Sequence, residues 1–260
     1  MAIFNEWCDQ KKEDINKTSL WIVSEKANIR DLIIPKLSVI VRSHYDDLNR
    51  IAEDLIELGY EKAEKILKSR MPQTKRGRSG DLGEILATEF AEEKFDFKIP
   101  IRRLRYKDGR DMALRGDDFI GIRYSDKEGL HLLKGESKSR LNLSQSTITE
   151  ARTVLNRDHG RCTPISLAFV FDRLLDSANS DDQKIGKILR NELAIEALPP
   201  TKISHALITI SGNVPIDLLR KDLKAADASR TQNVVNIYIP DHGNFIKLTF
   251  EEAQKLGNSK

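Results

Sequence analysis

The sequence predicts an α/β fold in which helices flank a central β-sheet, preceded by a helical region at the N-terminus. Apolar residues at helical spacing dominate the first part of the chain, whereas short apolar runs alternate with amphipathic segments in the second part. A polar, basic stretch rich in chain-breaking residues, 71–80, separates the two parts. We therefore expect a helical region over residues 1–75 and a mixed domain over residues 76–260.

The composition is that of a globular protein. The 260 residues are 39% hydrophobic and 32% charged with a net charge of +3, which excludes wholesale disorder and is too small to indicate nucleic-acid binding by itself. The longest apolar run, 165–171, is far shorter than the roughly 20 residues of a membrane helix. Cys8 and Cys162 cannot form a disulfide framework or a four-ligand zinc site. Because the N-terminus also lacks a secretory pattern, we expect a reduced, cytoplasmic protein with no membrane association.

The first part of the chain shows helical periodicity. Residues 33–40 predict a helix beginning near Pro35, although the β-branched residues 39–41 weaken this assignment. Residues 46–70 carry apolar side chains at spacings of three and four. They predict one helical stripe, formed by Leu48, Ile51, Ala52, Leu55, Ile56, Tyr60, Ala63, Ile66 and Leu67.

Helices and strands alternate beyond residue 80. Helices are expected over residues 80–94 with Ser79 as N-cap, after a capping box formed by Thr147 and Glu150, and over residues 182–198 and 215–225. Strands are expected over residues 99–106, 112–124, 130–137, 165–171, 203–210 and 234–239. A turn at 125–129 joins the second and third strands. This alternation is typical of a domain built on one sheet.

The residues that indicate chemistry lie on the two strands joined by this turn. Glu136 and Lys138 are two positions apart, so both project from one face of a strand. Asp118 directly precedes the apolar run of the other strand, and a hairpin brings it near Glu136. Two carboxylates suit Mg²⁺, and an adjacent lysine suits phosphodiester hydrolysis because it orients water and neutralises phosphate charge. An exposed ion pair and a turn acid are the alternative interpretation, and Asp117 remains an alternative to Asp118.

A third carboxylate, Glu84, lies on the helix expected over residues 80–94. It shares one side of that helix with Gly80, Ala87 and Ala91, whose small side chains allow another element to approach closely. From this position Glu84 can reach a metal site on the sheet. A plain solvated helix face is the alternative.

Basic residues cluster between Glu84 and Asp118. Seven of them lie within residues 98–115, opposed by only two aspartates, and three more lie in the preceding loop. Phosphate contacts supply most sequence-independent affinity for DNA. We therefore predict nucleic-acid contacts for Arg102, Arg103, Arg105, Lys107, Arg110 and Arg115, with a solvated strand and turn as the alternative.

The order of these motifs resembles the PD-(D/E)xK nuclease superfamily, which has a restriction-endonuclease-like fold. The helix acid Glu84 comes first, then Asp118 on one strand, then Glu136-Ser-Lys138 on the next strand, then a helix. This resemblance covers about residues 77–171. The fuller strings at 76–84, 114–122 and 135–139 are similar to the HamA family, a branch of the superfamily that supplies the nuclease subunit of the bacterial Hachiman antiphage system.

The resemblance implies roles for these residues and a setting for the protein. Asp118, Glu136 and Glu84 correspond to ligands of Mg²⁺ or Mn²⁺, and Lys138 corresponds to the catalytic lysine. DNA is the implied substrate, with no small-molecule substrate. The implied partner is a HamB-like helicase that restrains the nuclease and releases it on damaged or invading DNA. A further motif of some relatives is incomplete, because Gln145 is followed four residues later by threonine instead of tyrosine.

The sequence contains no P-loop, so a helicase partner must supply any ATP-driven motor. Two other interpretations remain open: a non-catalytic module that binds DNA or a partner, and an RNA-cleaving toxin. The choice between DNA and RNA, the cleavage polarity, the oligomeric state, the activation trigger and the role of the C-terminal strands are also open.

Overall fold

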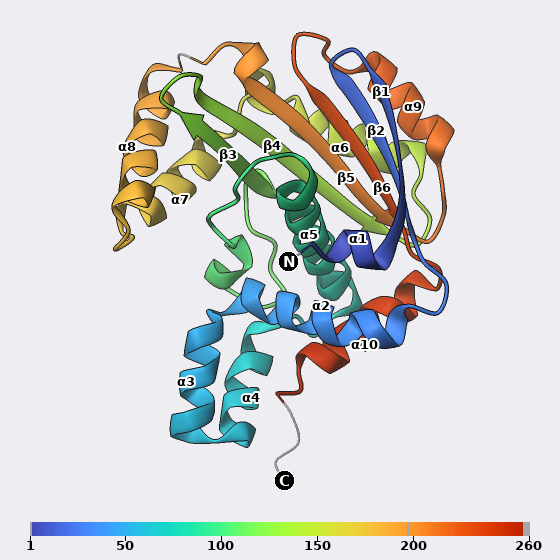
Figure 1. Cartoon of the computed structure of the whole chain (residues 1–260), viewed down its shortest axis with the longest axis vertical. Helices are drawn as coiled ribbons and strands as arrows, with labels where there is room; N and C mark the ends of the chain where they lie inside the picture. Colours follow the sequence, from blue (N-terminus) through green and yellow to red (C-terminus); the bar gives the residue numbers. More distant parts are fainter. Residues whose placement is uncertain (1, 197, 257–260) are drawn as a thin grey trace.

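The computed structural model describes residues 2–196 and 198–256, and within them the strands form one six-stranded sheet in the order β1-β2-β6-β5-β4-β3 (Figure 1). The strands are β1 (Cys8–Ile15), β2 (Thr18–Glu25), β3 (Phe119–Ser125), β4 (Gly129–Arg140), β5 (Ile203–Ser211) and β6 (Gln232–Tyr238). The four central strands, β2, β6, β5 and β4, run parallel, whereas the edge strands β1 and β3 are antiparallel to their neighbours. The prediction of a mixed sheet is confirmed.

Helices cover both faces of the sheet (Figure 1). They are α1 (Ile3–Trp7), α2 (Arg30–Tyr45), α3 (Leu48–Leu58), α4 (Tyr60–Arg70), α5 (Lys75–Lys94), α6 (Gln145–Leu155), α7 (Pro164–Leu175), α8 (Ser180–Ile195), α9 (Ile216–Ala225) and α10 (His242–Ala253). Alternate residues of β5 separate the two faces: Ala206 and Ile208 pack with the α5 side of the core, and Leu207 packs with Ile148 of α6 and Leu219 of α9. No helix within the described residues is long and apolar enough to cross a lipid bilayer.

The helical prediction for residues 1–75 is wrong for residues 8–25, which form β1 and β2. β2 pairs in parallel with β6, so this hairpin extends the same sheet that carries β3 and β4. The β-prone run 19–23 was a signal for this strand. The expected stripe over 46–70 is two helices, because Gly59, at φ +81°, breaks it. The division of the chain at residue 75 stays a prediction.

Three expected strands differ in the structure. Residues 165–171 belong to α7, because Pro164 starts a helix whose buried residues Leu167, Val170 and Leu174 recur at helical spacing while Ile165 is exposed. Residues 99–106 form an irregular segment ending in a 3₁₀ turn, Arg103–Tyr106. The strand expected over 112–124 begins only at β3.

The other predicted elements agree with the structure to within about five residues, although two N-caps differ. Helix α10 was not predicted. Thr74 caps α5 by accepting from Gly77 N, so α5 begins before Ser79. Ser144 caps α6 by accepting from Thr147 N at 3.4 Å, so the capping box at Thr147 does not form.

Close packing at Gly135 fixes the hairpin. A Cβ at this position would lie 2.2 Å from the ring of Phe119, the residue paired with it across β3 and β4. We expect Gly135→Ala to destabilise the protein by about 2 kcal/mol, because the buried Phe119 ring must move. Urea unfolding measures the effect.

The matched control is Gly80→Ala, since a Cβ on Gly80 meets nothing within 4 Å. A helical alanine in place of glycine is expected to be neutral or stabilising by up to about 1 kcal/mol. Equal stability losses in both variants would contradict the role of Gly135.

Candidate active site

Asp118 and Glu136 meet where β3 begins beside β4. The β3–β4 register begins with Phe119 opposite Gly135, and Asp118 N donates to Gly135 O at 3.2 Å, so Asp118 lies directly beside the Gly135–Ser137 segment of β4 that contains Glu136. The hairpin predicted from the sequence therefore brings these two residues together. β4 continues to Arg140, beyond the start of β3, which leaves this end of β4 open on that side.

The Asp118 carboxylate is anchored by the neighbouring strand. Its Oδ2 accepts hydrogen bonds from Ser137 N at 2.7 Å and from Ser137 Oγ at 2.8 Å. Within the described part of the chain, Oδ1 of Asp118 accepts no hydrogen bond from another side chain or the backbone. One oxygen thus fixes the orientation of the side chain and the other is free to bind a ligand.

Glu136 and Lys138 form a close ion pair on one face of β4, with 2.7 Å between Glu136 Oε1 and Lys138 Nζ. Lys138 Nζ also lies 3.4 Å from Glu150 Oε1 of α6. Burial, followed by the negative charge of Asp118, raises the pKa of Glu136 to about 8, against the lowering effect of Lys138. Burial lowers the pKa of Lys138, but the negative charge of the nearby Glu136 has the larger effect, so the pKa of the lysine is raised. The lysine therefore stays charged.

Glu84 approaches the same aspartate from α5. A Cβ on Gly83 would lie 3.0 Å from Ser139 Cβ, so α5 packs tightly onto β4 at this point, and Ala87 is buried as the small-residue argument predicted. Gly80, in contrast, faces open space. Burial and then the charge of Asp118 raise the pKa of Glu84 well above its usual range. Asp118 therefore acts electrostatically on both Glu84 and Glu136.

The structure separates the two aspartates that the sequence left as alternatives. Asp117 is 1% exposed, and its Oδ2 accepts from Thr163 N at 2.7 Å. Its Oδ1 lies 3.5 Å from Nζ of the buried Lys134. Because Asp117 is held in the interior, Asp118 is the better candidate for a ligand.

These carboxylates fit a hard cation. Carboxylate oxygens are the preferred protein ligands of Mg²⁺, which typically uses one or two of them and retains several waters. Within the described residues, Glu84 makes no hydrogen bond or ion pair through its side chain, and Glu136 Oε2 is likewise unpaired. No cluster of three or more His, Cys, Asp or Glu side chains is poised around one point in residues 2–196 and 198–256. Asp118 and Glu136 are therefore the candidate ligands for such a cation, and Glu84 is a third carboxylate that could join them.

The predicted basic residues divide into two groups. Four are engaged within the protein: Arg102 pairs with Glu92 and Glu89, Arg103 donates to backbone carbonyls of residues 115 and 117, Arg105 donates to Ser43 O, and Lys107 pairs with Asp81. Arg110 and Arg115 have exposed side chains.

Gln145 donates to Thr149 Oγ1 at 3.3 Å on the exposed surface of α6, so these two residues satisfy each other.

Three side chains near the site were given no role from the sequence. Ser137 anchors Asp118, Glu150 contacts Lys138, and Lys134 pairs with Asp117. Lys134 projects from the same face of β4 as Glu136 and Lys138. Its position within an apolar run was the sequence feature that could have indicated a buried, paired lysine. The other two depend on contacts that only the fold creates.

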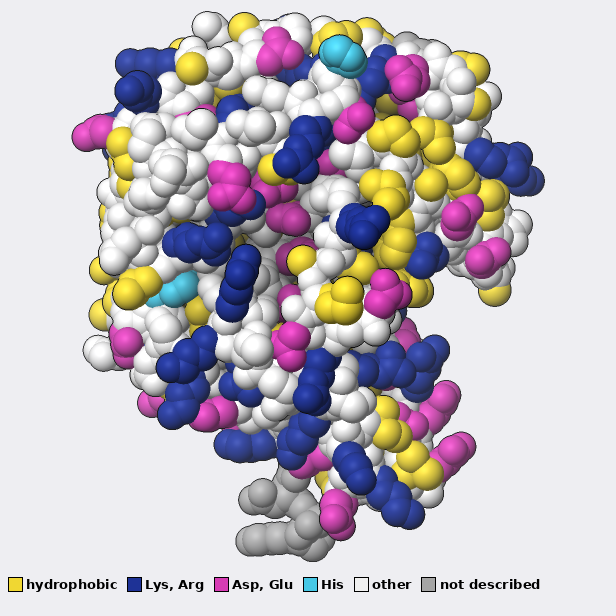
Figure 2. All heavy atoms as spheres, turned by 180° about the vertical axis from the view of Figure 1, so that it is seen from behind, with side chains coloured by type: hydrophobic (Ala, Val, Ile, Leu, Met, Phe, Trp, Pro, Cys, Tyr) yellow, Lys and Arg dark blue, Asp and Glu magenta, His cyan; other side chains and the backbone are white. Residues whose placement is uncertain are grey.

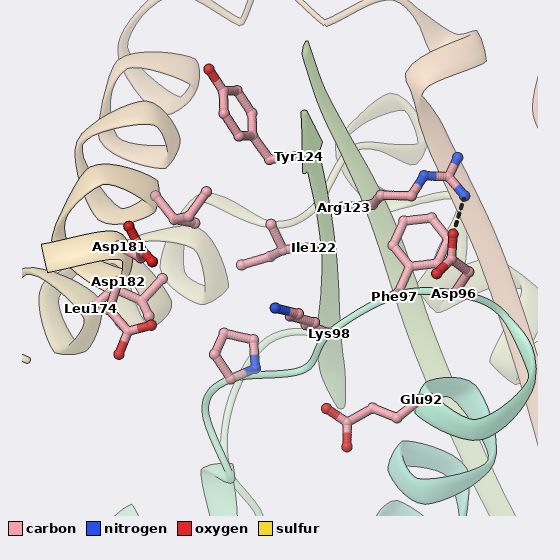
Figure 3. Close-up of a pocket in the computed structure, with 12 residues that line it drawn as sticks. Glu92, Asp96, Phe97, Lys98, Ile122, Arg123, Tyr124, Leu174, Asp181 and Asp182 are labelled. Carbon is pink, nitrogen blue, oxygen red and sulfur yellow. Dashed lines mark ion pairs between the residues drawn. The ribbon is translucent and has the colours of Figure 1, made fainter. Parts of the chain in front are cut away.

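A pocket with a volume of about 420 Å³ lies elsewhere. It is bordered by β3, by α8 and by residues 92–100, with Ile122 and Tyr124 on one side and Asp181 and Asp182 on the other (Figure 3). None of the candidate catalytic residues lines it.

Comparison with known proteins identifies the family. The HamA family model matches residues 1–253. The chain belongs to the HamA family. A curated relative, the Hachiman protein HamA of Bacillus cereus, is 28% identical over 110 residues, which are 42% of this chain and 38% of the relative. The matched region thus spans well under half of that relative, whereas the family match spans nearly the whole chain and confirms the resemblance seen in the motifs.

Proposed function

We propose that this HamA-family chain is a metal-dependent nuclease of the PD-(D/E)xK type that hydrolyses DNA with low sequence specificity. The observation that supports this most is that Asp118 is hydrogen-bonded to Gly135 and Ser137, the two neighbours of Glu136, while Lys138 Nζ lies 2.7 Å from Glu136 Oε1. A carboxylate pair beside a lysine at an open strand end is the arrangement that the superfamily motif requires. The motif order Glu84, Asp118, Glu136, Lys138 adds further support.

Each residue has a distinct task in this proposal. Asp118 and Glu136 would hold Mg²⁺, or Mn²⁺ in its place, and Glu84 would add a carboxylate from α5. When bound, the ion supplies Lewis-acid stabilisation of the phosphate. Lys138 orients the attacking water and places a positive charge where the phosphate gains negative charge. Glu150 and Glu136 hold the Lys138 ammonium from two sides.

Antiphage defence with a helicase partner is the proposed setting. The relative named Hachiman protein HamA supports the defence role. The sequence has no P-loop, so an ATP-driven step has to come from another chain. A nuclease of low specificity endangers its own cell, so a HamB-like helicase that restrains it until invading or damaged DNA is met gives the required control.

Exposed arginines near the site are the proposed phosphate contacts. Arg110 and Arg115 project from the loop before β3, and Asp111 of the same loop accepts from Thr74 N at 3.0 Å, which brings Arg110 close to Lys75 and Arg76. Figure 2 shows Lys and Arg side chains around a recessed group of acidic side chains. A basic rim beside acidic groups suits a polyanionic substrate held over a metal site.

We expect the double substitution Arg110→Ala/Arg115→Ala to weaken DNA binding similarly for all sequences, because phosphate contacts carry no base information. The slope of log affinity against log salt should fall by about 2. Fluorescence anisotropy in EDTA measures both. The matched variant Lys62→Ala/Lys65→Ala removes two charges from the distant α4 and should leave affinity unchanged; equal losses in both variants would contradict the assigned contacts.

Cleavage of linear DNA, supercoiled DNA and RNA by the purified chain, with Mg²⁺ and with EDTA, tests the proposed function. Mg²⁺-dependent cutting of DNA is expected. Cutting of RNA alone would favour the toxin interpretation. If neither polymer is cut, the assay is repeated with the helicase, ATP and DNA, and inactivity there would favour a binding module.

A further inference from the structure

A buried ion pair that the proposed reaction does not use lies directly behind the candidate site. Lys134 is 0% exposed and Asp117 is 1% exposed, and Lys134 Nζ lies 3.5 Å from Asp117 Oδ1. The same ammonium donates to the carbonyl oxygens of Arg157 at 3.0 Å and Arg161 at 2.7 Å. A buried ion pair is seldom a net source of stability, so its presence calls for another explanation.

Each member of the pair is a close sequence neighbour of one proposed ligand. Asp117 directly precedes Asp118 at the start of β3, and Lys134 lies two positions before Glu136 on the same face of β4. The contact therefore connects the segment before β3 to β4 beside the point where Asp118 is hydrogen-bonded to Gly135 and Ser137. Any shift of one strand end relative to the other has to break it.

The backbone on each side of Asp117 is also fixed. Arg103 donates to the carbonyls of Asp117 and Arg115, and its side chain is itself buried. Asp117 N donates to Ser166 Oγ at 2.7 Å, and Thr163 N donates to Asp117 Oδ2 at 2.7 Å, so the start of α7 holds the aspartate from the other direction.

Gly116 permits this close approach. Its φ is +94°, a conformation that favours glycine, and a Cβ there would lie 2.2 Å from Ser166 Oγ. Residues 115–117 are thus held by Arg103, by α7 and by Lys134. Asp118, the next residue, takes its position from this segment.

We propose that Asp117 and Lys134 are positioning residues that set the separation of the Asp118 and Glu136 carboxylates for a divalent cation. This inference rests on the proposed metal-dependent function and adds the device that prepares its metal site. Outer partners of this kind typically change metal affinity by roughly 10- to 100-fold when removed.

The test compares Mn²⁺ binding to the full-length chain and to Asp117→Asn, by isothermal titration and by Mn²⁺ electron paramagnetic resonance. An asparagine oxygen can still accept from Thr163 N, but the charge pair with Lys134 is lost. Affinity for Mn²⁺ is expected to fall at least about tenfold. In cleavage assays kcat should fall while KM for DNA stays unchanged, because no proposed phosphate contact is altered.

Two further variants separate positioning from stability. Asp46→Asn removes another buried, ion-paired aspartate. Asp46 follows α2, and its Oδ2 lies 3.2 Å from Arg70 Nε at the end of α4. This substitution should lower Tm without changing the affinity for Mn²⁺. The double variant Asp117→Asn/Lys134→Met leaves no unpaired charge in the interior, so it should recover stability and still bind Mn²⁺ weakly.

Folded Asp117 variants that bind Mn²⁺ within twofold of the wild-type chain would overturn the positioning role and leave the proposed function standing. A wild-type chain that binds no Mn²⁺ would instead overturn the proposed function, and the positioning role with it.

Discussion

Replacing Lys138 with alanine is expected to lower DNA cleavage at least about a hundredfold while leaving the fold intact. The ammonium lies 2.7 Å from Glu136 and 3.4 Å from Glu150, so it is held where phosphate charge would develop. Its removal deprives the reaction of a fixed positive charge and of a group that orients water. Steady-state cleavage of a fluorescent DNA duplex in Mg²⁺ measures the loss, and circular dichroism checks the fold.

Lys247→Ala is the matched control for this prediction. Lys247 is an exposed lysine of α10 that also lies near a glutamate, Glu251, at 3.8 Å. Its substitution removes the same charge far from the hairpin and should leave cleavage unchanged. Full activity in the purified Lys138→Ala protein would remove the lysine from the proposed mechanism.

Replacing Glu136 with glutamine is expected to abolish cleavage and at the same time to stabilise the metal-free protein at pH 8. The pKa of Glu136 rises from an ordinary 4.5 to about 8, mainly through burial and then through the charge of Asp118. Between these two values the unfolded chain releases a proton that the folded chain retains. Stability is therefore lost as pH rises from about 4.5 to 8, by an amount on the order of 4 kcal/mol.

Glutamine does not ionise, so the Glu136→Gln protein should lack this part of the pH dependence. Urea unfolding of both proteins at pH 5 and pH 8 in EDTA measures the difference. Mg²⁺ should raise the Tm of the wild-type chain at pH 8, because a bound cation offsets the charge, and should raise that of Glu136→Gln much less. Parallel losses of stability with pH in both proteins would contradict the assigned environment of Glu136.

The central hairpin could be predicted from the sequence because its signals are local. A turn at 125–129 between two apolar runs fixes which residues face each other, and the period of two places Glu136 and Lys138 on one face. Asp118 directly precedes the first strand of this hairpin, which brings it beside residues 135–137. Whether these residues bind a metal stays a prediction that the geometry supports.

The parts of the fold and of the candidate site that could not be predicted depend on tertiary contacts. The β-prone run 19–23 indicates a strand, but no feature within residues 1–75 indicates that β2 pairs in parallel with β6, more than 200 residues away. The run 165–171 is equally apolar in a helix or a strand, and only its packing selects α7. Arg103 and Lys107 were grouped with exposed basic residues, although buried carbonyls and Asp81 engage them. Local charge density does not reveal such internal partners.

The most direct test of the metal site is the anomalous scattering of Mn²⁺ in crystals of the full-length chain grown near pH 8. We expect one strong peak between the Asp118 and Glu136 carboxylates, beside Lys138, and its loss in crystals of Glu136→Gln. A peak elsewhere, or none at millimolar Mn²⁺ in well-ordered crystals, would contradict the proposed metal site.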